Sequence, residues 1–364
     1  MAKDADYKLL GWVAEDSESA LGKLSWKEYE PKAWEESDVD VKISHSGVCG
    51  SDIHTLRDDW GGTIFPCVVG HEIVGTVVRV GSQAGDFKIG ETVGIGAQSD
   101  SCRSRDGPCK ACETDEENYC RQRINTYDSI HRNGSIAQGG FGLYARAPAH
   151  FVIRIPPGVD PAHAAPMLCG GVTVYSPFKH HGVGPGSRVG IIGIGGLGHF
   201  AIMFAKAMGA SKIVAISRRL DKKKDALALG ADEYIASAED EGWEAKHSRS
   251  LDVVLSTISS KVCSPVPMGG YLGLLDVGGT FVQLGLPEEG LHLMASSLTK
   301  TRARLAGSII GSPSEIREML QLAADKEIKP WVELRPMEEA NQAILDMADG
   351  LPRYRYVLTT SGSS

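Results

Sequence analysis

The middle of the chain contains the sequence Val189-Gly190-Ile191-Ile192-Gly193-Ile194-Gly195-Gly196-Leu197-Gly198. An apolar run followed by G-x-G-x-x-G predicts a β-strand, a tight turn and the start of a helix. The glycines let a pyrophosphate approach the backbone, and the free N–H groups at the helix start attract its negative charge. This stretch therefore predicts a dinucleotide-binding unit, and the alternative is a glycine-rich turn without a ligand.

Strands and helices alternate on both sides of this turn. We expect a helix over about residues 197–208 and strands at residues 189–192, 212–217, 253–256 and 280–284. Alternation of this kind is typical of an α/β domain with a doubly wound parallel sheet.

The two ends of the chain differ from the middle in the secondary structure that their sequences predict. Before about residue 155, short β-rich runs lie between Gly, Pro and Asp turns, at residues 39–44, 73–80 and 151–155. These runs indicate a small barrel or sandwich. Towards the C-terminus we expect helices at residues 314–325 and about 337–349, and a closing strand at residues 354–359.

Composition limits the classes of function. A chain of 364 residues is long enough for two domains. The net charge of −8 argues against a nucleic acid or an anionic membrane as the main partner. The sequence shows no apolar run long enough for a transmembrane helix and no signal-peptide pattern. We therefore expect a cytoplasmic protein.

The end of the strand after the glycine-rich turn indicates which dinucleotide is bound. An NAD site usually has an acidic residue there, whereas a 2′-phosphate needs cations and hydroxyls. This chain has Ile216-Ser217-Arg218-Arg219, followed by Lys222, Lys223 and Lys224. The pattern favours NADP(H), although Asp221 keeps NAD open as an alternative.

Four of the eight cysteines are crowded into one short segment, as Cys102-x6-Cys109-x2-Cys112-x7-Cys120. In a long chain without an export signal, this crowding indicates a metal rather than disulfides. Four thiolates complete the coordination of Zn²⁺ and leave no position for a substrate. We therefore predict a structural zinc site; the alternative is four unconnected free thiols.

A second set of possible ligands lies in three glycine-rich segments. Cys49 is in Gly47-Val48-Cys49-Gly50-Ser51-Asp52-Ile53-His54, His71 is in Gly70-His71-Glu72, and Cys169 is in Leu168-Cys169-Gly170-Gly171. Together they could bind Zn²⁺ with two thiolates and one imidazole, which leaves one position open for a substrate. Taken singly, each could also be an ordinary buried side chain.

These motifs resemble those of the zinc-dependent medium-chain dehydrogenases/reductases. In this chain they occur in the order G-V-C-G-S-D-x-H, G-H-E-x-x-G-x-V, a cysteine cluster ending E-N-Y-C, and G-x-G-G-x-G. The resemblance runs essentially end to end and is greatest to the cinnamyl-alcohol-dehydrogenase-like branch, which includes NADP-dependent yeast alcohol dehydrogenases. It rests in detail on residues 66–72, 168–177, 216–218 and 353–356.

The resemblance implies a fold and two domains. We expect a GroES-like β-rich catalytic domain of residues 1–156 and 309–364, with an NADP-binding Rossmann domain of residues 157–308 inserted between its two parts. It also implies a homodimer, formed through edge strands around residues 293–310.

The resemblance also implies roles for single residues. Around a catalytic zinc it places Cys49, His71, Glu72 and Cys169, with Asp52 orienting a ligand histidine and Ser51 and His54 relaying a proton. For NADP it implies Thr173 beside the nicotinamide, Gly193, Gly195, Gly196, Leu197 and Gly198 at the pyrophosphate, and Ser217, Arg218 and Lys222 at the 2′-phosphate. The chain departs from the family pattern at residues 103–108, where the cysteine cluster has a longer loop.

The expected function is that of a zinc-dependent NADP(H) alcohol dehydrogenase, or aldehyde reductase, with two zinc ions per chain. Hydride would pass between NADPH and aromatic (cinnamyl-type) or aliphatic aldehydes. Two alternatives are an NADPH-dependent reductase of a specialised-metabolite iminium or enal, and a non-catalytic NADPH-binding protein. We expect the substrate pocket between the domains, with four lining candidates from loops near the ligand motifs, namely Leu56, Trp60, Ile130 and Phe141.

Overall fold

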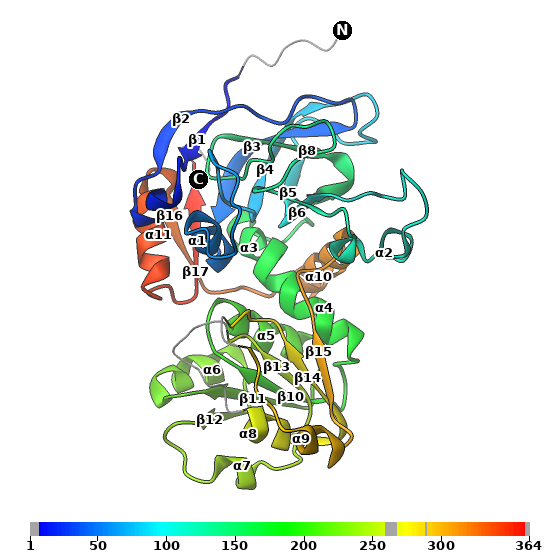
Figure 1. Ribbon diagram of the computed structural model, residues 1–364, viewed down its shortest axis with the longest axis vertical. Coiled ribbons are helices and arrows are strands. Elements are labelled where there is room, and N and C mark those ends of the chain that lie inside the picture. Colours follow the sequence, from blue (N-terminus) through cyan, green and yellow to red (C-terminus); the bar gives the residue numbers. More distant parts are fainter. Residues whose placement is uncertain (1–6, 259–267, 288–289, 361–364) are drawn as a thin grey trace. The chain divides into compact units, whose positions relative to one another are not determined.

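The structure is a computed structural model that describes residues 7–258, 268–287 and 290–360. The chain divides into two compact units (Figure 1). The first unit consists of Met1–Cys169 and Gly311–Ser364, and the second of Gly170–Ile310. Cys263, a cysteine outside both predicted zinc sites, lies outside the described residues.

The second unit is built on a six-stranded parallel sheet. Its strands follow the order β12-β11-β10-β13-β14-β15, and every neighbouring pair is parallel. Their bounds are β10 Arg188–Ile192, β11 Lys212–Ser217, β12 Glu233–Ala236, β13 Leu251–Ser256, β14 Leu275–Gln283 and β15 Arg304–Gly307. The order reverses at β10, so the chain runs outward in both directions from this strand, and the predicted doubly wound parallel sheet is confirmed.

Helices connect these strands. They are α4 Val172–His180, α5 Gly196–Ala207, α6 Lys223–Leu229, α7 Trp243–Lys246, α8 Met268–Gly273 and α9 Ala295–Thr299, with the 3₁₀ turn η5 Leu220–Lys222 before α6. β10 is buried along Val189–Ile192, and α5 is buried over much of its length, which fits the continuous apolar runs of a sheet covered by helices.

The first unit contains a seven-stranded sheet. Its order is β16-β17-β3-β4-β5-β9, and β8 pairs with β3. The bounds are β3 Asp38–Gly47, β4 Ile73–Val80, β5 Thr92–Ile95, β8 Tyr144–Pro148, β9 Val152–Arg154, β16 Val332–Pro336 and β17 Arg355–Thr359. All pairs are antiparallel except β16 with β17. The C-terminal strand β17 thus lies directly beside β3 from the N-terminal part of the chain.

Short elements complete this unit. Two strand pairs are β1 Leu10–Val13 with β2 Ser25–Glu28 and β6 Gln98–Asp100 with β7 Ile124–Asn125. The helices are α1 Gly50–Leu56, α2 Lys110–Glu113, α3 Pro161–Pro166, α10 Pro313–Asp325 and α11 Ala340–Ala348, and the 3₁₀ turns are η1 Ser17–Leu21, η2 Glu117–Tyr119, η3 Ala149–Phe151 and η7 Met337–Glu339. The π-helical turn η4 Met167–Gly171 begins in the first unit and ends in the second. α3 follows the predicted boundary at residue 156, but it packs against β3 and β4 and so lies in the first unit.

One core of the first unit lies where elements distant in sequence meet. Leu56 of α1, Phe141, Ala343 of α11 and Leu358 of β17 belong to one buried apolar cluster. α11 is amphipathic, and α10 begins with a capping box between Ser312 and Glu315, with Pro313 in its first turn. Within the described ranges, every helix is too short or too polar to cross a membrane.

Candidate functional site

Four metal-ligating side chains converge in the interior of the first unit. Cys49 lies immediately before α1, His71 and Glu72 immediately before β4, and Cys169 in the π-helical turn η4. All four are buried, and one ligand atom from each lies within 4.8 Å of those of the other three. The structure therefore brings together the four residues that the sequence predicts for a catalytic zinc.

Two of these ligand atoms have no hydrogen-bond partner among the described residues. They are Nε2 of His71 and Oε2 of Glu72, and both are fully buried. A buried polar atom without a partner costs free energy, and a bound cation would remove that cost. Two sulfurs, one imidazole nitrogen and one carboxylate oxygen are ligands that Zn²⁺ accepts in proteins. The donor set therefore fits the predicted zinc.

Asp52 connects two of the segments that carry these ligands. Its carboxylate accepts hydrogen bonds from the backbone N–H groups of Cys49 (2.8 Å) and Gly70 (3.0 Å). It is fully buried, and burial raises the pKa of its carboxyl. Asp52 thereby sets the position of Cys49 relative to His71 through the backbone.

Arg355 is a residue of this site that sequence reasoning missed. It lies on β17, is buried, and its guanidinium donates a hydrogen bond to Oε1 of Glu72. Burial raises the pKa of Glu72, and the guanidinium opposes that shift. The arginine is far from Glu72 in sequence, and only the pairing of β17 with β3 brings it to the site.

Tyr127 is a second residue that was missed. Its ring stacks on the imidazole of His71, with centroids 5.2 Å apart and an angle of 1° between the planes. Burial, and then the nearby Asp52 carboxylate, raise the pKa of Tyr127 well above its ordinary value. Tyr127 lies in a loop after the cysteine cluster, and nothing in the sequence of that loop predicts stacking on His71.

The predicted relay residues occupy α1. Ser51 lies in the first turn, with its Oγ 3.7 Å from Sγ of Cys49. His54 follows three residues later, on the same side of the helix, and its side chain is 35% exposed. Its Nδ1 lies 2.8 Å from Oδ2 of Asp59, and its ring stacks on Trp60 at 5.2 Å. Ser51 thus lies beside a candidate ligand, His54 lies at the surface, and their role as a relay stays a prediction.

The four predicted pocket residues do not form a group. Leu56 and Phe141 have no exposed surface and belong to the apolar core of the first unit. Both pack within this core in the structure, and their place in a substrate pocket stays a prediction. Trp60 and Ile130 are more than half exposed.

The four cysteines of the cluster also converge. Their sulfur atoms all lie within 4.8 Å of one another. The separations are 3.5 Å for Cys102 and Cys120, 3.6 Å for Cys102 and Cys112, and 4.0 Å for Cys109 and Cys120. A tetrahedral zinc with Zn–S bonds of about 2.3 Å needs sulfur–sulfur separations of about 3.8 Å. The arrangement fits a four-thiolate zinc site.

The glycine-rich turn lies between β10 and α5 in the second unit. Gly193 has φ +87°, and a Cβ on Gly198 would lie 1.9 Å from the carbonyl oxygen of Gly193, so both positions require glycine. A Cβ on Gly195 would meet no atom within 4 Å, which leaves the backbone open to a ligand. Gly196 and Leu197 form the first turn of α5.

The predicted 2′-phosphate residues lie beside this turn. Ser217 is the last residue of β11, which is parallel to β10, and Arg218 follows it. Lys222 donates a hydrogen bond from Nζ to the carbonyl oxygen of Ile194, at 2.7 Å. Thr173, predicted at the nicotinamide, is a buried residue of α4.

Comparisons with known proteins agree with this fold. Residues 35–157 match the alcohol dehydrogenase GroES-like domain, and residues 196–325 match the zinc-binding dehydrogenase family. The NADP-dependent alcohol dehydrogenase 6 of Saccharomyces cerevisiae is 40% identical over 333 residues, 91% of each chain. A cinnamyl alcohol dehydrogenase from Sorghum bicolor superposes with a TM-score of 0.90 and 34% identity, over 98% of this chain and 99% of that one. The CAD from Helicobacter pylori complexed with NADP(H) has a TM-score of 0.86 and 29% identity, over 97% and 98% of the two chains.

These similarities define the class of protein. The chain belongs to the zinc-dependent medium-chain dehydrogenases/reductases, with a GroES-like domain and a Rossmann-type parallel sheet. Within that family it is an alcohol dehydrogenase of the cinnamyl-alcohol-dehydrogenase-like branch.

Proposed function

We propose that this enzyme is a zinc-dependent, NADP(H)-linked alcohol dehydrogenase, or aldehyde reductase in the opposite direction, with aromatic (cinnamyl-type) or aliphatic aldehydes as substrates. The observation that carries the proposal is the convergence of Cys49, His71, Glu72 and Cys169, two of whose buried ligand atoms have no partner among the described residues. The names of its relatives support the substrate class.

In this proposal the chain binds two zinc ions, one at these residues and one at the four-cysteine cluster. When bound, the first zinc supplies Lewis-acid polarisation of the substrate oxygen, and NADPH supplies the hydride. Cys49, His71 and Cys169 would hold this ion, and Glu72 would supply a fourth ligand when no substrate is bound. Arg355 would hold Glu72 through Oε1 and leave Oε2, which has no partner among the described residues, as the oxygen available to the ion.

Ser51 and His54 have the task of moving a proton between the buried substrate oxygen and water. Ser51 begins the path beside Cys49, and His54 ends it at the surface. Histidine suits this role because it gains and loses a proton near neutral pH. Asp59 and Trp60 fix the ring of His54 through a hydrogen bond and a stacking contact.

The preference for NADP(H) is supported by charge. Arg218 and Lys222 are cations near the end of β11, where an NAD site would have a carboxylate. The CAD from Helicobacter pylori complexed with NADP(H) supports the same cofactor.

The proposal also includes a homodimer in the cytoplasm. β15 is an edge strand of the parallel sheet, and Leu305 on it is 41% exposed, which supports a partner strand at this edge. Sedimentation velocity measures the mass of the particle, and a monomer at micromolar concentration would contradict this part of the proposal.

A coenzyme and substrate panel tests the proposed activity. NADPH and NADH oxidation by the purified chain would be compared with cinnamaldehyde, an aliphatic aldehyde and a cyclic iminium. We expect reduction of the aldehydes with NADPH preferred over NADH. Faster turnover with NADH, or reduction of the iminium alone, would contradict the proposal.

A further inference from the structure

The loop of residues 103–108 between the first two cysteines of the cluster has an unusual backbone. Arg103 and Ser104 have φ of +48° and +55°, in the left-handed region that non-glycine residues rarely occupy. Gly107 follows with φ +130°. A loop with this backbone needs contacts that hold it in place, or it would leave the position of Cys102 poorly defined.

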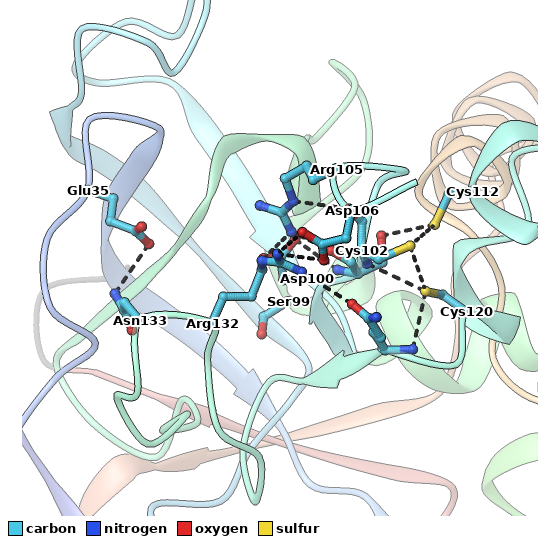
Figure 2. Close-up of polar contacts among 12 residues, drawn as sticks. Glu35, Ser99, Asp100, Cys102, Arg105, Asp106, Cys112, Cys120, Arg132 and Asn133 are labelled. Atoms are coloured by element: carbon cyan, nitrogen blue, oxygen red, sulfur yellow. Dashed lines mark hydrogen bonds and ion pairs between the residues drawn. The ribbon is translucent and has the colours of Figure 1, made fainter. Parts of the chain in front are cut away.

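Arg105 supplies most of these contacts. Its Nη2 donates to both carboxylate oxygens of Asp100, at 2.9 and 2.8 Å, and also to the carbonyl oxygen of Ser101 (Figure 2). Its Nε donates to the carbonyl oxygen of Cys102 at 3.1 Å. The backbone N–H of Arg105 binds that same carbonyl at 2.9 Å. One residue of the longer loop therefore holds three consecutive residues that lead into the cluster.

Asp100 anchors this arrangement. It is the last residue of β6, and its side chain is only 6% exposed. It also accepts a hydrogen bond from the backbone N–H of Ser101. The guanidinium is thus bound to a fixed, nearly buried carboxylate rather than to a mobile surface group.

Two of the three residues held by Arg105, Ser101 and Cys102, contact two other cysteines. The Oγ of Ser101 lies 3.5 Å from Sγ of Cys112, and the backbone N–H of Cys102 donates to Sγ of Cys120 at 3.5 Å. A shift of this peptide segment would therefore disturb three of the four sulfur atoms together (Figure 2).

A second ion pair holds the tip of the loop, but it lies between two exposed side chains. Asp106 pairs with Arg132 at 2.7 Å, and Arg132 also binds Gln122 at 3.2 Å. Both members of this pair are exposed, whereas Arg105 is exposed but its partner Asp100 is nearly buried, and pairs between two exposed groups contribute little. The position of Cys102 thus depends mainly on Arg105.

We infer that Arg105 is a positioning residue for the four-cysteine metal site, and that it makes the longer loop compatible with a closed zinc site. The inference rests on the proposed zinc at this cluster. Groups that orient metal ligands typically change metal affinity 10- to 100-fold when they are removed.

The test compares Arg105→Met with Arg103→Met in the purified, zinc-loaded chain. Arg103 is in the same loop, carries the same charge and is exposed, so it is a matched control. Each protein would be treated with a chelator and iodoacetamide, and the alkylation rate of each cysteine followed by mass spectrometry. Cys49 and Cys169 serve as internal references for the other candidate site.

We expect Arg105→Met to raise the alkylation rates of Cys102, Cys112 and Cys120 about tenfold or more, with the reference cysteines and Arg103→Met unchanged. Arg105→Met leaves the Asp100 carboxylate without its guanidinium, and adding Asp100→Asn removes that buried charge. We therefore expect the double variant to fold normally and its cluster cysteines still to be alkylated faster than those of the wild type. Rates in Arg105→Met equal to those in Arg103→Met would overturn the inference.

The outcomes also separate this inference from the proposed function. If the wild-type chain takes up no zinc at the cluster after loading, and its cluster cysteines react at once, the four-cysteine site itself is contradicted and with it the role of Arg105. Aldehyde reduction by the wild-type chain is measured in the same samples, and its absence would contradict the proposed activity alone.

Discussion

Arg355 and Glu72 form a buried ion pair beside the candidate catalytic site, in which Arg355 occupies Oε1 of Glu72, while Oε2 has no hydrogen-bond partner among the described residues. The pair joins the C-terminal strand β17 to the segment before β4. A buried charge that loses its partner is strongly destabilising, so this contact links the stability of the first unit to its site.

We expect Arg355→Met to lower the free energy of unfolding by about 3–5 kcal/mol, because it leaves the Glu72 carboxylate buried and unpaired. Urea denaturation of the two variants Arg355→Met and Arg353→Met measures the effect, and Arg353 serves as an exposed control on the same segment. Adding Glu72→Gln to Arg355→Met should recover part of the loss. Equal stability of the two arginine variants would show that the ion pair does not act this way.

The stacked ring of Tyr127 should help to hold His71 in the orientation that a metal requires. We expect Tyr127→Leu to weaken metal binding at the catalytic site about tenfold or more, whereas Tyr127→Phe keeps the ring and the affinity. Cobalt substitution followed by visible absorption spectroscopy reports on this site. If Tyr127→Leu binds cobalt with the wild-type spectrum and affinity, the stacking contact has no positioning role.

The relay on α1 predicts an effect on pH dependence. We expect His54→Gln to lower kcat for aldehyde reduction by up to about 10²-fold and to change the pH–rate profile, because the proton then lacks its last carrier to water. Full kinetic profiles of wild type and His54→Gln over a range of pH provide the measurement. An unchanged profile would remove His54 from the mechanism.

Coenzyme choice should depend on Arg218. A charge-assisted hydrogen bond contributes about 1.5–3 kcal/mol, so Arg218→Glu should raise KM for NADPH by about 10- to 100-fold and improve use of NADH. Steady-state kinetics with both coenzymes measure the change. An NADPH preference that survives the substitution would contradict the assignment of the 2′-phosphate site.

His131 should make the first unit sensitive to acid. Burial, and then the positive charge of Lys32, lower the pKa of His131 from its ordinary value of 6.5 to about 4. Between these values the unfolded chain binds a proton that the folded chain does not, so stability falls as the pH falls, by up to about 3 kcal/mol for this group. His131→Gln should therefore show a smaller loss of stability between pH 7 and pH 4 than wild type in urea denaturation. Parallel curves for the two proteins would contradict this.

Local patterns were enough to predict the parallel sheet and both ligand sets. The strand at residues 212–217 is predicted by its apolar run, and the glycine-rich turn by positions at which a side chain would clash with the backbone. Both signals depend only on residues that are close together in the sequence. Cys49, His71 and Cys169 lie in glycine-rich segments, and the four candidate ligands of the cluster are cysteines crowded between residues 102 and 120.

The contacts between distant segments were not predictable in this way. Arg355 and Tyr127 reach the site through strand pairing and loop packing, which leave no periodic trace in the sequence. The same limit explains Leu56 and Phe141, which lie near the ligands in sequence but pack into a core with α11 and β17. Proximity along the chain did not indicate this packing, and the role of both residues in a substrate pocket stays a prediction.

The central claim is that Cys49, His71 and Cys169 hold a zinc ion that is required for aldehyde reduction with NADPH. The most direct measurement is the rate of NADPH oxidation with cinnamaldehyde by wild type and by Cys49→Ser, together with the zinc content of each protein. We predict about two zinc ions per wild-type chain, one in the variant, and no measurable reduction by the variant. Full activity in Cys49→Ser with only the cluster zinc bound would contradict the claim.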